Sequence, residues 1–107
     1  MSRLTLDEVQ LQVWSNKVAK GFNTTDIALE FGLLTAEVGE AFTAWHKGDR
    51  HGLADELADI ALFLAGLAEM ANIDLEVAVE RKLAVNAGRT YVRGPNGTLI
   101  KDGEEKT

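Results

Sequence analysis

The sequence predicts an all-α protein, a four-helix bundle followed by a short C-terminal β-hairpin. Apolar residues recur at steps of three and four in successive stretches, which is the helical period. Short runs containing Gly, Asn or Asp separate these stretches, and helices joined by short loops are typical of bundles. After the last stretch, a Gly-Pro-Asn-Gly turn lies between two short runs with strand character.

The first helix is expected to begin after Thr5, which forms a capping box with Glu8, and to end at Gly21. A break over residues 21–25 follows. The second helix then carries a stripe that we expect to face the core, made of Ile27, Phe31, Leu34, Val38, Ala41 and Trp45. Residues 48–52 are typical of a helix stop and restart.

The third helix is expected from about Leu53 to Ala71, with a core-facing stripe made of Leu57, Ile60, Leu64 and Leu67. Asn72 can end it in a left-handed conformation, and Asp74 can cap a fourth helix that runs to about Gly88. The hairpin strands are expected at 91–93 and 98–100. A lone hairpin is marginally stable, so we expect it to pack on the bundle or on another protomer.

The totals fit one domain over residues 1–107, with the bundle at about 5–90, the hairpin at about 90–101 and a loose tail at 102–107. The 17 acidic and 11 basic residues give a net charge of -6, which argues against binding a nucleic-acid backbone. The absence of Cys excludes disulfides and thiolate metal sites. Neither a secretory signal nor a membrane span is recognisable, so we expect a cytoplasmic protein without a membrane partner.

Two acidic couplets, Glu37-x-x-Glu40 and Glu56-x-x-Asp59, lie on the flanks of the apolar stripes. Residues three apart share one side of a helix, so each couplet directs two carboxylates to the same place. Fifteen residues between the couplets let the third helix return antiparallel to the second. Four facing carboxylates need protons or a hard cation such as Mg²⁺. From the pattern alone, a metal site and a solvated acidic face both remain open.

Lys82, Asn86 and Arg89 lie at i, i+4 and i+7 in the fourth helix, on one side. Two cations and an amide in a row suit a chain of phosphates, because Arg can grip an oxyanion with two N–H groups. An ordinary exposed stripe is the alternative.

These motifs, read in order, resemble those of the MazG-like nucleoside triphosphate pyrophosphohydrolases. That family carries E-x-x-E, a spacer, E-x-x-D, and a later K-x-x-x-N-x-x-R-x-Y, which matches Lys82 to Tyr91 here. The resemblance implies an all-α bundle that uses Mg²⁺, with Mn²⁺ as a substitute, and cleaves nucleotides between the α and β phosphates. It further implies four metal ligands, Glu37, Glu40, Glu56 and Asp59. Lys82, Asn86 and Arg89 are the implied contacts of the triphosphate, and Tyr91 is a further expected substrate-binding residue. The expected catalytic residues are Glu37, Glu40, Lys82 and Arg89.

The chain departs from many members at Ala36, where they carry a Glu that is a candidate for activating the attacking water. Glu37 could orient the water instead, with Glu30 as a weaker candidate that we otherwise expect at the surface. Trp14 or Trp45 could stack on a nucleobase, although Trp45 is expected to pack in the core.

No His follows a Glu by three residues, so the Glu-x-x-His motif of di-iron bundles is missing. His46 is expected to end the second helix and His51 to lie in a loop.

The expected reaction is hydrolysis of a (deoxy)nucleoside triphosphate to the monophosphate and pyrophosphate, as in nucleotide-pool house-cleaning. A close alternative is phosphoribosyl-ATP as substrate, and a rival of another class is a non-catalytic bundle that binds nucleotides or a partner. A homodimer or homotetramer is expected, because apolar residues lie on more than one face.

Overall fold

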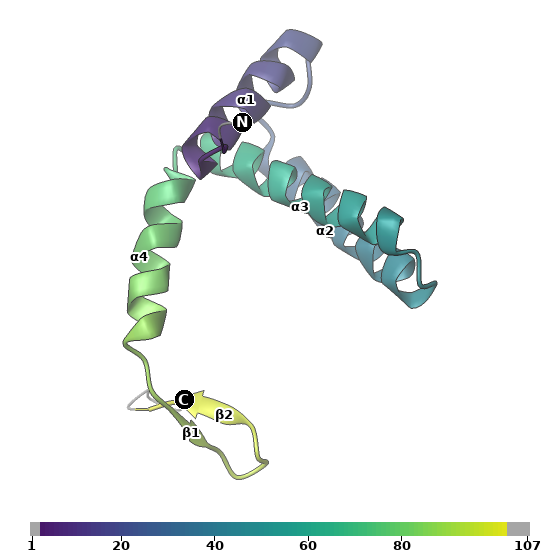
Figure 1. The fold of residues 1–107 in the computed structure, drawn as a ribbon. Helices are drawn as coiled ribbons and strands as arrows, with labels where there is room; N and C mark the ends of the chain where they lie inside the picture. Colours follow the sequence, from purple (N-terminus) through teal and green to yellow (C-terminus); the bar gives the residue numbers. More distant parts are fainter. Residues whose placement is uncertain (1–2, 103–107) are drawn as a thin grey trace. The chain divides into compact units, whose positions relative to one another are not determined.

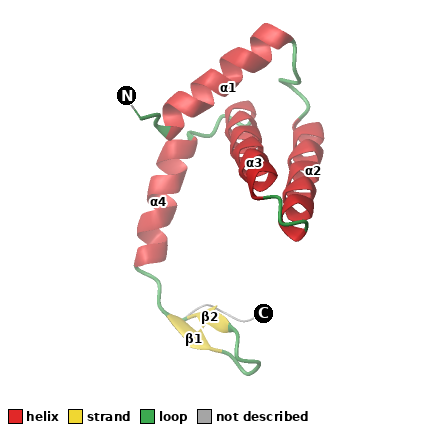
Figure 2. Cartoon of the chain, turned by 45° about the vertical axis from the view of Figure 1, so that its right-hand side comes forward, coloured by secondary structure: helices red, strands yellow, loops and turns green. Residues whose placement is uncertain are grey.

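The computed structural model describes residues 3–102 and contains four helices followed by a two-stranded antiparallel sheet (Figures 1 and 2). The predicted all-α class with a C-terminal hairpin is therefore confirmed. The chain divides into two compact units, Met1–Glu76 and Val77–Thr107. The elements are α1 Leu6–Lys20, α2 Ile27–His46, α3 Arg50–Met70, α4 Leu75–Ala87, β1 Tyr91–Arg93 and β2 Leu99–Lys101.

Caps define the ends of α1 as the sequence predicts. The Thr5 side chain accepts a hydrogen bond from the Glu8 amide at 3.1 Å, and the Glu8 carboxylate accepts one from the Thr5 amide at 3.0 Å. Gly21 follows the last turn with a φ of 71°, a left-handed conformation that Gly adopts without steric cost. The capping box and the terminal glycine therefore fix both ends of the helix.

The third helix begins three residues earlier than predicted. The Asp49 carboxylate accepts a hydrogen bond from the Gly52 amide at 2.9 Å, so the helix begins at Arg50. A Cβ on Gly52 would collide with this carboxylate, so the glycine is part of the cap rather than of a loop. The prediction that His51 lies in a loop is therefore wrong, because His51 belongs to the first turn of α3.

Helices α2 and α3 lie side by side and antiparallel, and α1 packs on α3 (Figures 1 and 2). Small residues allow this close packing: of the hydrophobic residues that are buried within residues 3–102, Ala41, Ala65 and Ala68 are alanines, and the other is Leu67. Gly66 lies opposite α1, where an added Cβ would come 3.2 Å from Val13 Cγ1 and 3.4 Å from Lys17 Cδ. The glycine therefore lets the Lys17 stem lie directly on α3.

The apolar stripes predicted to face the core are largely exposed. Ile27, Phe31, Val38 and Trp45 of α2 are 38–62% exposed, and Leu57 and Leu64 of α3 are 54% and 43% exposed. The expectation that Trp45 packs in the core is wrong, because its side chain is 62% exposed. An antiparallel helix pair buries only the side between the helices, so a wider apolar face stays uncovered.

Gln10 joins α1 to the turn that follows α3. Its side chain is buried, donates to the Ile73 carbonyl oxygen at 2.8 Å and accepts from the Leu75 amide at 3.1 Å. Between the two helices, Asn72 adopts the predicted left-handed conformation, with a φ of 58°. One glutamine thus pairs two backbone groups at a helix end and the next helix start.

In the second unit, the strands pair Tyr91 with Lys101, Val92 with Ile100 and Arg93 with Leu99. The second strand begins one residue later than predicted, because the Thr98 amide donates to Asn96 Oδ1 and keeps Thr98 in the turn. The Asp102 amide donates to the Thr90 carbonyl oxygen at 2.8 Å. The remainder of the predicted tail, 103–107, lies outside the described residues. Within residues 3–102, no helix has the length and hydropathy needed to cross a bilayer.

Candidate active site

Three carboxylates from two helices converge in the first unit. Oxygens of Glu37 on α2 and of Glu56 and Asp59 on α3 lie within 4.8 Å of one another. Glu37 and Glu56 are half-buried, and Asp59 is exposed. Because α3 runs antiparallel to α2, Glu37 of the first acidic couplet lies close to both residues of the second couplet, Glu56 and Asp59. We call these three residues the carboxylate cluster.

The cluster holds a proton on Glu37 more tightly than an isolated glutamate does. Hydrogen bonding to the Glu56 side chain, then burial, then the charges of Glu40, Glu56 and Asp59 raise the pKa of Glu37 from 4.5 to about 7. Each cause acts against the ionised form. The cluster is thus a place where negative charge is crowded and a positive charge is stabilised.

The donor set of the cluster fits a hard divalent cation. One oxygen of Glu37 and one of Glu56 are buried, and neither has a hydrogen-bond partner among residues 3–102. Unpaired buried oxygens are costly, and Mg²⁺ and Mn²⁺ favour carboxylate oxygen ligands. Glu37, Glu56 and Asp59 are the residues that would hold such an ion.

Glu40, the fourth predicted ligand, lies outside this group of three. It is exposed and follows Glu37 by one turn of α2. Its charge nevertheless contributes to the raised pKa of Glu37. The structure therefore brings three of the four predicted ligands together, and the role of Glu40 stays a prediction.

We predict that Glu37 of the metal-free protein titrates near pH 7, as followed by the carbon-13 shift of its carboxyl carbon. Because the folded state holds this proton more tightly than the unfolded chain does, the free energy of unfolding falls as the pH rises from about 4.5 to about 7. Glu56→Gln should move the midpoint of the Glu37 titration toward 4.5, since it removes the carboxyl group that raises the pKa of Glu37 most. A midpoint near 4.5 in the wild-type protein would contradict the crowding of these carboxylates.

Glu30 is buried, and the expectation of a surface position is wrong. It is 2% exposed, and its Oε1 accepts hydrogen bonds from Lys17 Nζ at 2.9 Å and Asn23 Nδ2 at 3.2 Å. Its Oε2 has no partner among the described side chains and backbone. Sequence reasoning missed Lys17 and Asn23 altogether. A signal existed for Lys17 in its spacing, because it follows Trp14 by three residues and Val13 by four, which places all three on one side of α1.

The two tryptophans lie in different surroundings. Trp14 is half-buried on α1. Trp45 lies near the end of α2, with its ring 5.8 Å from that of Phe42, and it lines a pocket with the residues of the α2–α3 turn. Stacking of a base on either ring stays a prediction.

The Lys-Asn-Arg row belongs to the second unit. Lys82 is exposed on α4, and the Arg89 guanidinium donates to Asn86 Oδ1 at 2.8 Å. Arg89 lies two residues beyond the end of α4, so the expectation that it lies on the helix is wrong. Its amide still donates to the Asn86 carbonyl oxygen, which continues the last turn. Tyr91, the last residue of the motif, is 48% exposed in β1.

The solved structure of a Cyanophage S-2L MazG-like pyrophosphohydrolase, bound to dGDP and three catalytic Mn²⁺ ions per active site, shares the fold of this chain. The TM-score is 0.72 at 23% sequence identity, over 95% of this chain and 97% of that one.

Curated relatives match shorter segments. A dATP/dGTP diphosphohydrolase of Cyanophage S-2L is 32% identical over 66 residues, which are 62% of this chain and 59% of that protein. A dATP/dGTP diphosphohydrolase of Salmonella phage PMBT28 is 42% identical over 45 residues, covering 42% of this chain and 16% of the relative. Human dCTP pyrophosphatase 1 is 29% identical over 69 residues, covering 54% and 41%. The matches thus span from about a sixth to under two thirds of the relatives' lengths.

The family model of the MazG nucleotide pyrophosphohydrolase domain matches residues 28–90 of this chain. This segment is more than half of the 107 residues and contains both acidic couplets and the Lys-Asn-Arg row. The chain therefore belongs to the MazG nucleotide pyrophosphohydrolase domain family.

Proposed function

We propose that this protein hydrolyses (deoxy)nucleoside triphosphates to nucleoside monophosphate and pyrophosphate with the help of Mg²⁺, for which Mn²⁺ can substitute. The observation that carries the proposal is the convergence of Glu37, Glu56 and Asp59 oxygens within 4.8 Å. Family membership and relatives that act on dATP, dGTP and dCTP support it. Such an activity suits the removal of unwanted nucleotides from the cellular pool.

In the proposed reaction, the oxygen of a water bonds to the α-phosphorus, and the bond from this phosphorus to the α–β bridging oxygen breaks. A divalent ion, when bound, polarises the α-phosphate and lowers the pKa of a bound water. Glu37, Glu40, Glu56 and Asp59 are proposed to hold it. Glu37 has a second task, since its carboxylate can accept a hydrogen bond from the water and orient it.

Lys82, Asn86, Arg89 and Tyr91 are proposed to bind the triphosphate. Lys82 and Arg89 carry only N–H donors, so they can neutralise the charge that builds on the departing pyrophosphate. The hydrogen bond from Arg89 to Asn86 supports this role, because it keeps the guanidinium at the end of the row. Positioning and charge neutralisation are the main work in phosphoryl-type transfer.

One panel of substrates tests the function. The common nucleoside triphosphates, their deoxy forms and phosphoribosyl-ATP are incubated with and without Mg²⁺, and pyrophosphate and orthophosphate are measured separately. Metal-dependent release of pyrophosphate from a nucleoside triphosphate is expected. Orthophosphate as the first product would contradict the cleavage position, and turnover of phosphoribosyl-ATP alone would favour the alternative substrate. No turnover of any compound would favour the non-catalytic bundle.

We further propose that the chain forms a homodimer or homotetramer. The apolar residues of α2 that remain exposed support this assembly, since a second copy could cover them. Light scattering at working concentration is expected to give at least twice the monomer mass of 11.6 kDa. Val38→Glu, at a side chain that is 50% exposed, should shift the mass toward the monomer, whereas Glu80→Gln on the exposed part of α4 should not. A monomer mass for the wild type would overturn this proposal.

A further inference from the structure

We propose, resting on the proposed function, that Asn16 of α1 binds the hydrogen-bonding edge of the substrate's base. The base itself lies in the apolar pocket that α1, the loop after α1 and α3 form in the first unit. Asn16 is thereby a residue that distinguishes bases with a pairing edge from flat rings without one.

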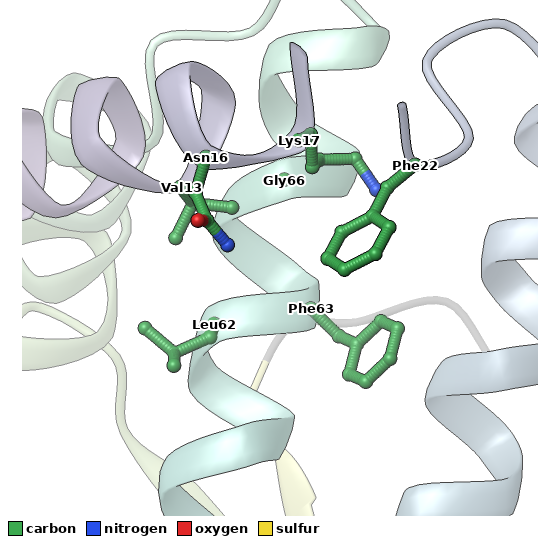
Figure 3. A pocket seen from close by; sticks show the side chains of 7 residues that line it. All are labelled: Val13, Asn16, Lys17, Phe22, Leu62, Phe63 and Gly66. Carbon is green, nitrogen blue, oxygen red and sulfur yellow. The ribbon is translucent and has the colours of Figure 1, made fainter. Parts of the chain in front are cut away.

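The pocket has the size and the lining of a site for a flat ring. Its volume is about 140 Å³, and Val13, Phe22, Leu62 and Phe63 contribute apolar side chains to its wall (Figure 3). A cavity of roughly 150 Å³ is enough to hold a benzene ring. An adjoining pocket of about 280 Å³ shares Lys17 and both phenylalanines with the first. The space therefore extends beyond a single six-membered ring, as a purine requires.

The pocket lies on the side of α3 that carries part of the carboxylate cluster. Phe63 follows Asp59 by four residues and Glu56 by seven, so the three residues share one side of the helix. Four residues correspond to about 6 Å along the helix axis. A base against Phe63 and an α-phosphate at the cluster can therefore belong to one nucleotide, with the sugar between them.

The ring of Phe22 is fixed beside the pocket by hydrogen bonds around it. The Phe22 amide donates to the Lys17 carbonyl oxygen at 2.9 Å. Next in the chain, the Asn23 side chain donates to Glu30 Oε1 at 3.2 Å, and the same oxygen accepts from Lys17 Nζ at 2.9 Å. In Figure 3 the rings of Phe22 and Phe63 lie on the same side of the pocket. These aromatic walls are thus in place before a base stacks on them.

Asn16 contributes a polar group of the pocket that is free to bind a ligand. In Figure 3 its amide group points from α1 toward the Leu62 side of the pocket. The residue is exposed, and its side chain has no hydrogen-bond partner among residues 3–102. Lys17, the charged residue of the pocket, is already held in its ion pair with Glu30. The Asn16 amide therefore offers an unused acceptor and unused donors.

An amide matches the pairing edge of a nucleobase. Each common base carries a donor next to an acceptor on this edge, either an amino group beside a ring nitrogen or a ring N–H beside a carbonyl oxygen. A side-chain amide can form two hydrogen bonds with such an edge. Half a turn of the amide exchanges its oxygen and its NH₂ group, so Asn16 can pair with both kinds of edge and by itself favours neither.

Base analogues that keep the shape but lack the edge test the role of Asn16. Difluorotoluene has the shape of thymine and methylbenzimidazole that of adenine, and neither can form the paired hydrogen bonds. For dTTP and dATP the wild type is expected to give a kcat/KM about tenfold above that for the matching analogue triphosphate, the scale of one or two hydrogen bonds. Asn16→Leu, which keeps the size of an exposed side chain, should bring both ratios near one.

Gln12→Leu is the matched control for this variant. Gln12 is also an exposed amide on α1, four residues earlier, and lies outside the pocket, so its replacement should keep both ratios. Equal kcat/KM values for the natural nucleotides and their analogues in the wild type, or the same ratios in Asn16→Leu as in the wild type, would overturn the inference and leave the proposed function standing.

Binding to the metal-free protein separates the base site from the proposed function. The side-chain amide signal of Asn16 is followed by NMR while dTMP, dAMP or deoxyribose phosphate, which has no base, is added. Shifts with both nucleotides and none with the sugar phosphate are expected, and they would support the base site even if no nucleotide were hydrolysed. An Asn16 signal that does not respond to either nucleotide would contradict it.

Variants of the aromatic walls locate the base independently of Asn16. Phe63→Leu should weaken the binding of dTMP and dAMP, and Phe22→Leu, at a ring that is 53% exposed, gives the same test if the first variant does not fold. Trp45→Leu tests the rival position, the pocket at the α2–α3 turn. Weaker binding in Trp45→Leu together with normal binding in the phenylalanine variants would place the base at that turn and overturn the inference.

Discussion

Replacing Glu56 by Gln is expected to lower kcat by on the order of a thousandfold, which corresponds to about 4 kcal/mol of lost transition-state stabilisation. Glu56 contributes to the carboxylate cluster with an oxygen that is buried and unpaired among residues 3–102. The amide keeps the volume but removes the negative charge that would hold a cation. Steady-state rates of pyrophosphate release, measured over a range of Mg²⁺ concentrations, check this expectation.

Asp55→Asn is the matched control for this variant. Asp55 precedes Glu56 on α3, is exposed and lies outside the cluster, so its loss removes one acidic charge and should leave the rate nearly unchanged. The metal-free Glu56→Gln protein should also be at least as stable as the wild type, because one of the crowded carboxylates is gone. A fully active Glu56→Gln enzyme would mean that the site lies elsewhere.

The helices and their caps could be predicted from the sequence because local interactions determine them. Thr5 and Glu8 are three residues apart and pair with each other's backbone, so the sequence itself contains the whole motif. The meeting of Glu37 with Glu56 and Asp59 followed from two spacings, the three-residue step within a helix and the fifteen residues between the couplets. The loop length determined which helix faces could meet.

The burial of Glu30 could not be predicted in this way. Its partner Lys17 is 13 residues away on another helix, and Asn23 reaches it from the intervening loop. Within α2 alone, Glu30 shares the stripe of Glu37 and looks like one more surface acid. The close passage of Lys17 over Gly66 depends on how α1 crosses α3, which helical periodicity does not contain.

The exposure of the α2 stripe has a similar cause. Periodicity shows that Ile27, Phe31 and Val38 form an apolar face, but it does not show whether the same chain or a second copy covers that face. In the described chain, burial is concentrated on the alanine-rich side instead, at Ala41, Ala65 and Ala68. The sequence thus indicates the extent of the apolar face, which the proposed homodimer or homotetramer would cover.

Arg89→Ala is expected to lower kcat/KM by about a hundredfold, roughly 3 kcal/mol, if the guanidinium grips the departing pyrophosphate. Its link to Asn86 at 2.8 Å would orient it for this contact. Arg89→Lys should restore little of the activity, since an ammonium group cannot form the bidentate hydrogen bond that a guanidinium forms with a phosphate. Mg²⁺ affinity should stay nearly unchanged, because a guanidinium has no lone pair to offer a metal.

Calorimetry of Mg²⁺ and of a non-hydrolysable triphosphate analogue, beside steady-state kinetics, distinguishes these effects in the wild type, Arg89→Ala and Lys82→Ala. Arg81→Ala is the matched control, because Arg81 is exposed on α4 and lies outside the Lys-Asn-Arg row. The analogue should bind more weakly to both row variants and normally to the control. Normal kinetics in Arg89→Ala and Lys82→Ala would reduce the row to a solvated helix face. The carboxylate cluster would then have to supply all of the charge neutralisation through the cation that it holds.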